Sequence, residues 1–340
     1  MAITYSITRL DTPPYKIDQK KYAQFEQRKN VFGRMLYDKK APFYQKSMYM
    51  NTEKIIAQNR KGYSRIEFAR VLAAPTIHDY FEGAFSWKKL QNRRGVMSIP
   101  TLEQYPVSDP VFMSKEIKKT AKIFGASVVG ITKLDERWLY SYAMDGKQVE
   151  IADEYTYAIV TAIAMDNEAI RTSPAYSAHT ETGLTYSRMA FTVACLAEFI
   201  RYLGYKAIPI GNDIALSIPL ALDAGLGELG RHGLLITPEF GPCVRLCKVF
   251  TDLPLEPDKP IEFGVADYCR SCDKCVIACE EGAIQSEKEP SYAVVCSSNN
   301  PGILRWAVNH DKGYQFWLDN GSECSNCIAA CPFDPRNDSG

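Results

Sequence analysis

Seven cysteines near the C-terminal end of the sequence fall in two tight runs. The runs are Cys269-x2-Cys272-x2-Cys275-x3-Cys279 and Cys324-x2-Cys327-x3-Cys331-Pro332. Zinc-binding thiols usually come in pairs, whereas four thiols at the intervals of the first run are typical of bacterial ferredoxins. In that arrangement three thiolates hold one [4Fe–4S] cluster and the fourth reaches a second cluster. The sequence therefore predicts two [4Fe–4S] clusters that carry electrons; one cluster or a zinc site is the alternative.

The second run repeats the latter half of the first, so we expect the two runs to exchange a ligand. The expected ligands of one cluster are Cys269, Cys272, Cys275 and Cys331. Those of the other are Cys279, Cys324, Cys327 and a fourth thiol, for which Cys296 is the nearest unassigned candidate. Glu280 follows Cys279 where the ferredoxin run usually has proline, which removes a turn-setting residue but no ligand.

Length, charge and hydropathy limit the class of protein. The chain has 340 residues, 46% of them hydrophobic, so we expect one large domain and a smaller module. Lys and Arg together number 40, as do Asp and Glu, and a net charge of zero disfavours a nucleic-acid partner. No apolar run approaches the ~18–20 residues of a membrane span, and the N-terminus does not have the apolar core of a signal peptide. We expect the chain as written to be soluble; a processed protein whose leader was removed would look the same.

The region before the cysteines alternates between helical and strand-like patterns. We expect helices over 114–126, capped by Ser114, over 186–203, stopped by Gly204, and over 216–227. We expect strands over 127–134, 157–165, 206–210 and 233–241. The first 110 residues are polar, tyrosine-rich and interrupted by proline, and are expected to cover a core rather than form one. This alternation predicts an α+β fold, an α/β sandwich.

Short polar segments interrupt the apolar core region. One runs from Gly211 to Asp213 directly after a strand, the next from Gly225 to Gly233 is dense in glycine, and Arg245 lies inside a strand-like run. Glycines after strands allow a ligand to approach the backbone closely, which favours a cofactor site; a purely structural role for these glycines is the alternative. The letters G-x-G-x-x-G occur here after a helix rather than a strand, which disfavours a dinucleotide fingerprint. The candidate cofactor contacts are Gly211, Gly225, Gly227, His232 and Gly233.

Taken together, these segments resemble the corrinoid-dependent reductive dehalogenases. The resemblance extends from about residue 110 to 335 and includes "TGLTYSRMA", "IPIGND", "GLGELGRHG", "PCVRLCKV" and both cysteine runs. It implies a nitroreductase-like domain that buries a base-off cobamide, and a ferredoxin-like module whose two [4Fe–4S] clusters supply electrons to it. The implied division is a capping and substrate-channel region over 1–110, the corrinoid-binding core over 111–260 and the cluster module over 261–340. In the implied reaction, an organohalide loses halide and gains a proton and two electrons.

The resemblance also assigns three catalytic positions, namely Tyr186, Asn212 and Arg245. A tyrosine hydroxyl is a weak acid, with an unperturbed pKa near 10, unless its phenolate is stabilised. We expect Tyr186 to donate the proton, Arg245 to stabilise the phenolate from within hydrogen-bond reach, and Asn212 to steady the halogen or the hydroxyl. Arginine at the basic position points to the respiratory, chloroethene-reducing branch of the family. Cys243 and Cys247, which flank Arg245 at alternate positions, are expected to be packing residues.

The implied partners are a small organohalide and an external electron donor, namely a ferredoxin, a flavodoxin or a membrane quinol-linked protein, with a membrane anchor subunit as an option. The location is either cytoplasmic or that of the mature form of a twin-arginine-exported, membrane-associated enzyme. Two other functions compete with this one. The related epoxyqueuosine reductases act on tRNA, and this function would require a basic surface and an aspartate as general acid. A non-enzymatic electron carrier would explain the cysteines but not the residues that precede them.

Overall fold

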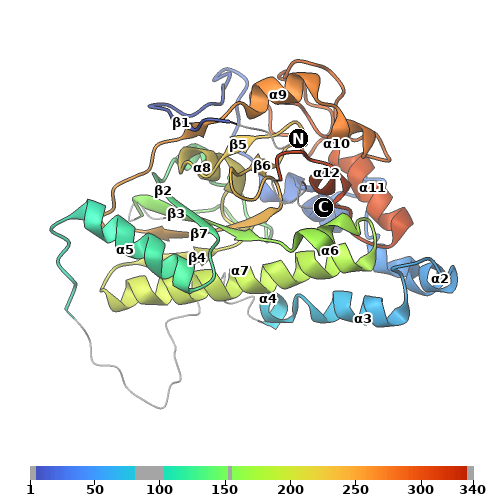
Figure 1. The fold of residues 1–340 in the computed structure, drawn as a ribbon, viewed down its shortest axis with the longest axis horizontal. Coiled ribbons are helices and arrows are strands. Elements are labelled where there is room, and N and C mark those ends of the chain that lie inside the picture. The colour runs from blue at the N-terminus through green and yellow to red at the C-terminus, as the bar shows by residue number, and fades with distance from the viewer. Residues whose placement is uncertain (1–4, 81–102, 152–154, 335–340) are drawn as a thin grey trace, which may run out of the picture.

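An antiparallel sheet of four strands lies at the centre of the fold, in the order β2-β3-β7-β4 (Figure 1). The computed structural model describes residues 5–80, 103–151 and 155–334. The strands are β2 (Val128–Lys133), β3 (Tyr157–Ala164), β7 (Val244–Thr251) and β4 (Ala207–Ile210). β3 and β7 pair along their whole length, from Tyr157 opposite Thr251 to Ala164 opposite Val244. The predicted strands over 127–134, 157–165 and 206–210 are thereby confirmed.

Helices cover both faces of this sheet (Figure 1). α5 (Pro110–Ile123) and α7 (Tyr176–Tyr202) pack on one face, and α8 (Ser217–Asp223) packs on the other. Side chains alternate between the two faces along β7, so Cys247 and Val249 join the core beneath α7, whereas Phe250 joins the core beneath α8. Arg245 therefore lies on the α7 side and Lys248 on the α8 side.

Two helices begin earlier than the sequence patterns predict. α5 is capped by Asp109, whose side chain accepts hydrogen bonds from the backbone N–H groups of Val111 and Phe112, with Pro110 in the first turn. The prediction of Ser114 as the cap is wrong: Ser114 is buried and its hydroxyl bonds the backbone of Glu256. α7 begins ten residues before the predicted start, so Tyr186 lies inside the helix.

The segment predicted as a strand over 233–241 is mostly a turn. Only β6 (Leu235–Ile236) forms there, paired with β5 (Glu228–Leu229). The hydroxyl of Thr237 accepts a hydrogen bond from the N–H of Phe240, and its backbone bonds Gly241 in both directions, which closes the chain on itself. The strand prediction over 233–241 is therefore wrong except for Leu235–Ile236, and the segment does not extend the central sheet.

The N-terminal region adds short helices around this core. They are α1 (Val31–Tyr37), α2 (Thr52–Ala57), α3 (Arg65–Ala73) and α4 (Thr76–Tyr80). Their buried side chains pack on other parts of the chain: Phe43 on Tyr314, and Tyr63 and Val71 around Tyr176 of α7. Phe43 is fully buried in this contact. Phe81, Phe85 and Trp87, aromatic residues of the expected capping and substrate-channel region, lie outside the described residues.

The cysteine-rich end of the chain consists of short helices. They are α9 (Val265–Ser271), α10 (Lys274–Ile277), α11 (His310–Asn320) and α12 (Asn326–Ala329). A short pair of strands, β1 (Thr8–Arg9) with β8 (Ile261–Glu262), joins the beginning of the chain to the segment before α9. Within the described residues, none of the helices is long and apolar enough to span a membrane. The fold thus mixes helices and strands, as predicted.

Candidate active site and cysteine module

Tyr186, Asn212 and Arg245 meet at one edge of the central sheet although they come from three different elements. Tyr186 projects from the middle of α7, Asn212 from the loop after β4, and Arg245 from the start of β7. The Nδ2 of Asn212 donates a hydrogen bond to the Tyr186 hydroxyl at 2.9 Å. The Arg245 guanidinium carbon lies 5.4 Å from the centroid of the Tyr186 ring. Tyr186 and Arg245 are partly exposed and Asn212 is exposed, so the group faces accessible space.

The contact between Arg245 and Tyr186 differs from the expected one. The guanidinium lies over the ring face, and its hydrogen bond goes to Thr182 Oγ1 at 3.1 Å, one helical turn before Tyr186. The Nε of Arg245 is buried and has no hydrogen-bond partner among the described residues. The cation therefore acts on the tyrosine through the π-face and retains one unused donor.

A buried lysine holds the loop that carries Asn212. Lys248 is fully buried on the α8 side of β7, and its Nζ donates to the Gly211 carbonyl at 2.7 Å and to Ser217 Oγ at 3.1 Å. Asp213 accepts from the Gly211 N–H at 3.0 Å. Burial lowers the pKa of Lys248 to about 8 and raises that of Asp213, and each charge opposes the shift of the other. Lys248 and Asp213 thus fix the backbone of the loop, and the Asn212 side chain remains available to Tyr186.

His78 is a member of this group that no sequence pattern had indicated. It lies on α4, and its ring meets the Tyr186 ring edge-on, with centroids 5.3 Å apart. α4 can approach because α7 has Gly183 at that point, where a Cβ would lie 3.1 Å from Pro75 Cδ. A histidine so far away in the sequence could be linked to Tyr186 only once the packing of α4 on α7 was known.

Several glycines of the glycine-rich stretch are required by close contacts with neighbouring backbone. A side chain at Gly225 would collide with the Lys259 carbonyl, and one at Gly227 would collide with the Ile236 carbonyl. Gly225 and Gly233 also have positive φ angles, 70° and 76°, which other residues rarely adopt. The close approach that Gly225 and Gly227 allow is therefore to neighbouring backbone, and cofactor contacts by these glycines stay a prediction.

The four thiols assigned to the first cluster line one cavity. It is small, about 10 Å³, and is bordered by Cys269, Cys272, Cys275 and Cys331. Burial, together with the neighbouring thiols, raises the pKa of Cys275 and of Cys331 to about 12 in each case. Such thiols become thiolates when a metal supplies compensating positive charge. The structure thus brings Cys331 to the first run, across the sequence gap that separates them.

Two residues of the glycine-rich stretch also border this cavity, Arg231 and His232. Arg231 is buried and donates to the Cys269 carbonyl through Nε at 3.0 Å, and to the carbonyls of Gln285 and Glu287 at 3.1 and 2.8 Å. Burial lowers the pKa of His232 to about 4. Arg231 was not singled out from the sequence, since its role depends on carbonyls that only the fold brings together.

The thiols assigned to the second cluster form a neighbouring group. Burial raises the pKa of Cys327, and the charges of Cys324, Cys275 and Cys279 add to that rise. Cys296 is linked to this group through backbone: its Sγ lies 3.8 Å from the Val308 carbonyl, and the next residue, Asn309, bonds Ala283, whose N–H donates to Cys279 Sγ. Within the described residues, no three His, Cys, Asp or Glu side chains are placed to hold one metal ion. The thiols surround spaces rather than single points.

The remaining cysteines have other surroundings. Cys243 and Cys247 are fully buried among apolar side chains, as expected for packing residues. Cys247 also contacts Thr161, with Sγ 3.0 Å from Oγ1. Neither thiol borders the cavity of the first run.

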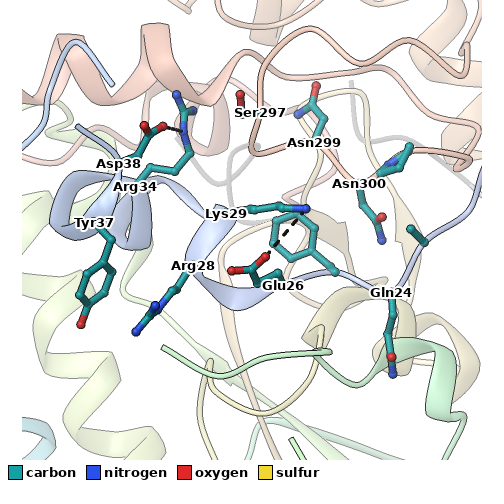
Figure 2. Close-up of a pocket in the computed structure, with 13 residues that line it drawn as sticks. Gln24, Glu26, Arg28, Lys29, Arg34, Tyr37, Asp38, Ser297, Asn299 and Asn300 are labelled. Carbon is teal, nitrogen blue, oxygen red and sulfur yellow. Dashed lines mark hydrogen bonds and ion pairs between the residues drawn. The ribbon is translucent and has the colours of Figure 1, made fainter. Parts of the chain in front are cut away.

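A separate pocket of about 540 Å³ lies where the N-terminal region meets the loop after Cys296 (Figure 2). Charged side chains in its wall form ion pairs: Lys29 with Glu26 at 3.9 Å, and Arg34 with Asp38 at 3.2 Å. Arg34 also binds Asp311 at the start of α11, with NH2 to Oδ2 at 3.0 Å. The pocket shares no lining residue with the Tyr186 group, and its ion pairs fasten the N-terminal region to the C-terminal helices.

Comparisons with known proteins follow the same regions. A family model described as the reductive dehalogenase subunit matches residues 117–255. The tetrachloroethene reductive dehalogenase of Desulfitobacterium hafniense is 41% identical over 263 residues, which cover 65% of this chain and 48% of that protein. The tetrachloroethene reductive dehalogenase of Sulfurospirillum multivorans is 37% identical over 260 residues, which cover 68% and 52%. The chain spans about half the length of these curated relatives.

A shorter match and a solved structure complete the comparison. The epoxyqueuosine reductase of Listeria monocytogenes is 33% identical over 124 residues, 36% of this chain and 30% of that protein. The catabolic reductive dehalogenase NpRdhA, in complex with 3-bromo-4-hydroxybenzoic acid, superposes with a TM-score of 0.74 at 24% identity, over 96% of this chain and 44% of that one. The fold is therefore that of the reductive dehalogenases. The region that contains Tyr186, Asn212 and Arg245 thus matches the reductive dehalogenase family, over residues 117–255.

Proposed function

We propose that this chain catalyses the reductive dehalogenation of a small organohalide, a chlorinated alkene in the first instance. The observation that carries the proposal is the hydrogen bond from Asn212 to the Tyr186 hydroxyl at 2.9 Å beneath the Arg245 cation. Curated relatives with up to 41% identity are tetrachloroethene reductive dehalogenases, which supports the choice of substrate class. The net reaction is R–Cl + 2e⁻ + H⁺ → R–H + Cl⁻.

The geometry defines how Tyr186 can release a proton. Because Asn212 Nδ2 is the donor, the hydroxyl oxygen acts as the acceptor, and the hydroxyl proton is left free to point toward a substrate. The permanently charged Arg245 over the ring favours the phenolate that remains after transfer. Asn212 continues to donate to that phenolate, so the bond strengthens as charge develops. Tyr186 is thus the proton donor, and the other two residues stabilise its conjugate base.

The protein's own groups fit the two kinds of cofactor implied. A cobamide would supply the low-potential metal chemistry that breaks the carbon–halogen bond, and two [4Fe–4S] clusters would supply its electrons. The unpartnered Nε of Arg245 and the exposed amide of Asn212 would be available to a bound cofactor. Gly211, His232 and Gly233 are its proposed contacts, with Gly225 and Gly227 shaping the stretch behind them.

The cluster assignment rests on the chemistry of the donor set. Four thiols line one cavity, and three others form a group next to it. We assign Cys269, Cys272, Cys275 and Cys331 to the first cluster, and Cys279, Cys296, Cys324 and Cys327 to the second. The clusters would receive electrons from a ferredoxin, a flavodoxin or a membrane quinol-linked partner.

The test is halide release by the loaded protein. The chain is produced anaerobically with a cobamide, its iron and cobalt are counted, and reduced methyl viologen serves as donor. We expect about eight iron atoms and one cobalt per chain, and chloride release from tetrachloroethene that falls in the Tyr186→Phe variant. A fully loaded protein that dehalogenates neither chloroethenes nor halophenols would overturn the proposal, and conversion of an epoxyqueuosine-containing tRNA stem-loop would replace it with the competing activity.

A further inference from the structure

The imidazole of His232 lies in the wall of the cavity formed by four thiols, and one of its nitrogens has no partner. The side chain is 6% exposed, and Nε2 finds no hydrogen-bond partner among the described residues. The same cavity is bordered by Cys269, Cys272, Cys275 and Cys331. A buried donor or acceptor without a partner costs free energy, so an unsatisfied nitrogen at such a place indicates a missing group.

The hydrogen bond at the other ring nitrogen defines what Nε2 can do. The backbone N–H of Leu234 donates to His232 Nδ1 at 3.2 Å, so Nδ1 carries no proton. In a neutral imidazole the proton must then reside on Nε2, which makes this atom a donor in need of an acceptor. The four cysteine side chains that border the cavity offer sulfur atoms as acceptors.

The ring is held in this orientation by its neighbours. A Cβ at Gly230 would lie 2.7 Å from His232 Cε1, so glycine at position 230 leaves the room that the imidazole occupies. On the next residue, Arg231 ties this stretch to the Cys269 carbonyl at 3.0 Å. The donor therefore belongs to the same rigid unit as a proposed cluster ligand.

We propose that the Nε2–H of His232 donates a hydrogen bond to a sulfur atom of the cluster held by Cys269, Cys272, Cys275 and Cys331, and thereby raises the reduction potential of that cluster. The reduced cluster carries more negative charge on its sulfur atoms than the oxidised one, so a donor aimed at sulfur stabilises the reduced state more. His232 is in this role a positioning and tuning residue for electron transfer, in addition to the ligands themselves. The inference rests on the cluster assignment in the proposed function.

The experiment compares two substitutions, each of which replaces one of the two ring nitrogens with an amide group at a similar position. His232→Gln places an amide N–H near the position of Nε2, whereas His232→Asn offers an acceptor to Leu234 but no donor at that depth. Each full-length variant is reconstituted with iron and sulfide in the absence of cobamide, and the potential is measured by an EPR-monitored titration. In His232→Asn, we expect the reduced-to-oxidised ratio at a fixed potential to fall about tenfold, equivalent to roughly 59 mV for a one-electron couple, with His232→Gln closer to the native value.

A second readout and a control keep the result interpretable. The native protein should show an EPR hyperfine coupling to an exchangeable proton that disappears in D2O and in His232→Asn. The affected couple should be the one perturbed by Cys272→Ser, and Cys247→Ala, a buried thiol away from the cavity, should shift neither couple. Unchanged potentials in a His232→Asn protein with full iron content would overturn this inference while leaving the proposed function intact, whereas failure of the native chain to assemble clusters would count against the proposed function.

Discussion

The Tyr186 group and the cysteine module place their functional side chains by different means. Tyr186 and Arg245 are held by a long helix and a central strand whose buried faces pack together, and Asn212 lies on a loop that the buried Lys248 fastens. Cys269, Cys275 and Cys327 lie in α9, α10 and α12, which have seven, four and four residues, and the other thiols lie outside these helices. Helices of that length are unstable on their own. This difference indicates that the folded core preforms the Tyr186 group. The proposed clusters, by contrast, would stabilise the fold of the cysteine module.

The largest expected effect comes from removing iron. Without clusters, the short helices between 265 and 277 and between 324 and 331 lose their cross-links, while β3 and β7 retain their full ladder. Hydrogen exchange measured before and after chelation should show fast exchange in the cysteine segments and unchanged protection in the sheet. Equal loss of protection in both regions would break the comparison.

The next effect is expected from Cys331→Ser, which tests the ligand exchange. Cys331 borders the cavity of the first run, so its loss should damage the cluster of Cys269, Cys272 and Cys275. Iron should fall by up to half, and the EPR signal of the Cys324 and Cys327 cluster should persist. Cys195→Ser, on α7, is the control and should leave both signals unchanged. A selective loss of the other signal would show that the assignment is wrong.

Tyr186→Phe removes one oxygen and leaves the aromatic packing, so the preformed site should keep its shape. General acid catalysis typically contributes ~10²–10⁴-fold, and we expect turnover to fall by about that factor with iron and cobalt content unchanged. Steady-state chloride release, normalised to cobalt, is the measurement. Near-normal turnover by a fully loaded variant would show that the proton comes from another group.

Arg245 should tolerate lysine better than leucine. Lysine retains a charge near the Tyr186 ring but loses the planar contact with the ring face and the fixed bond to Thr182. We expect Arg245→Leu to approach the Tyr186→Phe defect and Arg245→Lys to lose less, about tenfold. Rates of both variants at equal cofactor loading decide this, and equal rates would show that the positive charge is unimportant.

The smallest expected effect concerns Asp223, a buried carboxylic acid in the region of the central sheet. Asp223 accepts from Tyr15 at 2.7 Å and from Trp138 at 3.0 Å, and burial raises its pKa to about 6. The folded state therefore binds this proton more tightly than the unfolded state, so the contribution to stability is present below about pH 4 and is lost as pH rises through 6. Asp223→Asn should gain relative to the native chain by up to about 3 kcal/mol between pH 4 and 7, measured by urea unfolding. A pH-independent difference would contradict the assignment.

The sequence predicts the two regions to different extents for a physical reason. The thiol runs are recognised from the number of residues between successive cysteines, so Cys269 to Cys279 could be identified without knowledge of the fold. Three of the four central strands, β2, β3 and β4, follow from apolar runs in the same way, whereas β7 was indicated only as a strand-like run around Arg245. The start of α7 was missed because the polar residues from Thr180 to Thr185 hide its apolar face, and the cap of α5 was missed because Asp109 lies before the periodic residues.

The finer contacts could not be predicted because they depend on tertiary packing. The sequence, through resemblance, indicated Tyr186, Asn212 and Arg245, but not that Asn212 would bond the hydroxyl while Arg245 lies over the ring. His78 reaches the group only through the packing of α4 on α7. Such contacts are set by how elements pack rather than by spacing along the chain.

The buried Lys248 beneath the Asn212 loop has a consequence for protein engineering. Its bonds to Gly211 and Ser217 fasten the backbone of the loop without using the Asn212 side chain. Position 212 can therefore be varied in a saturation library while the loop keeps its course, whereas most substitutions of Lys248 would leave Asp213 as an uncompensated buried charge. A library at position 212 therefore probes the chemical role of Asn212 separately from the folding of its loop, which substitutions of Lys248 would disturb.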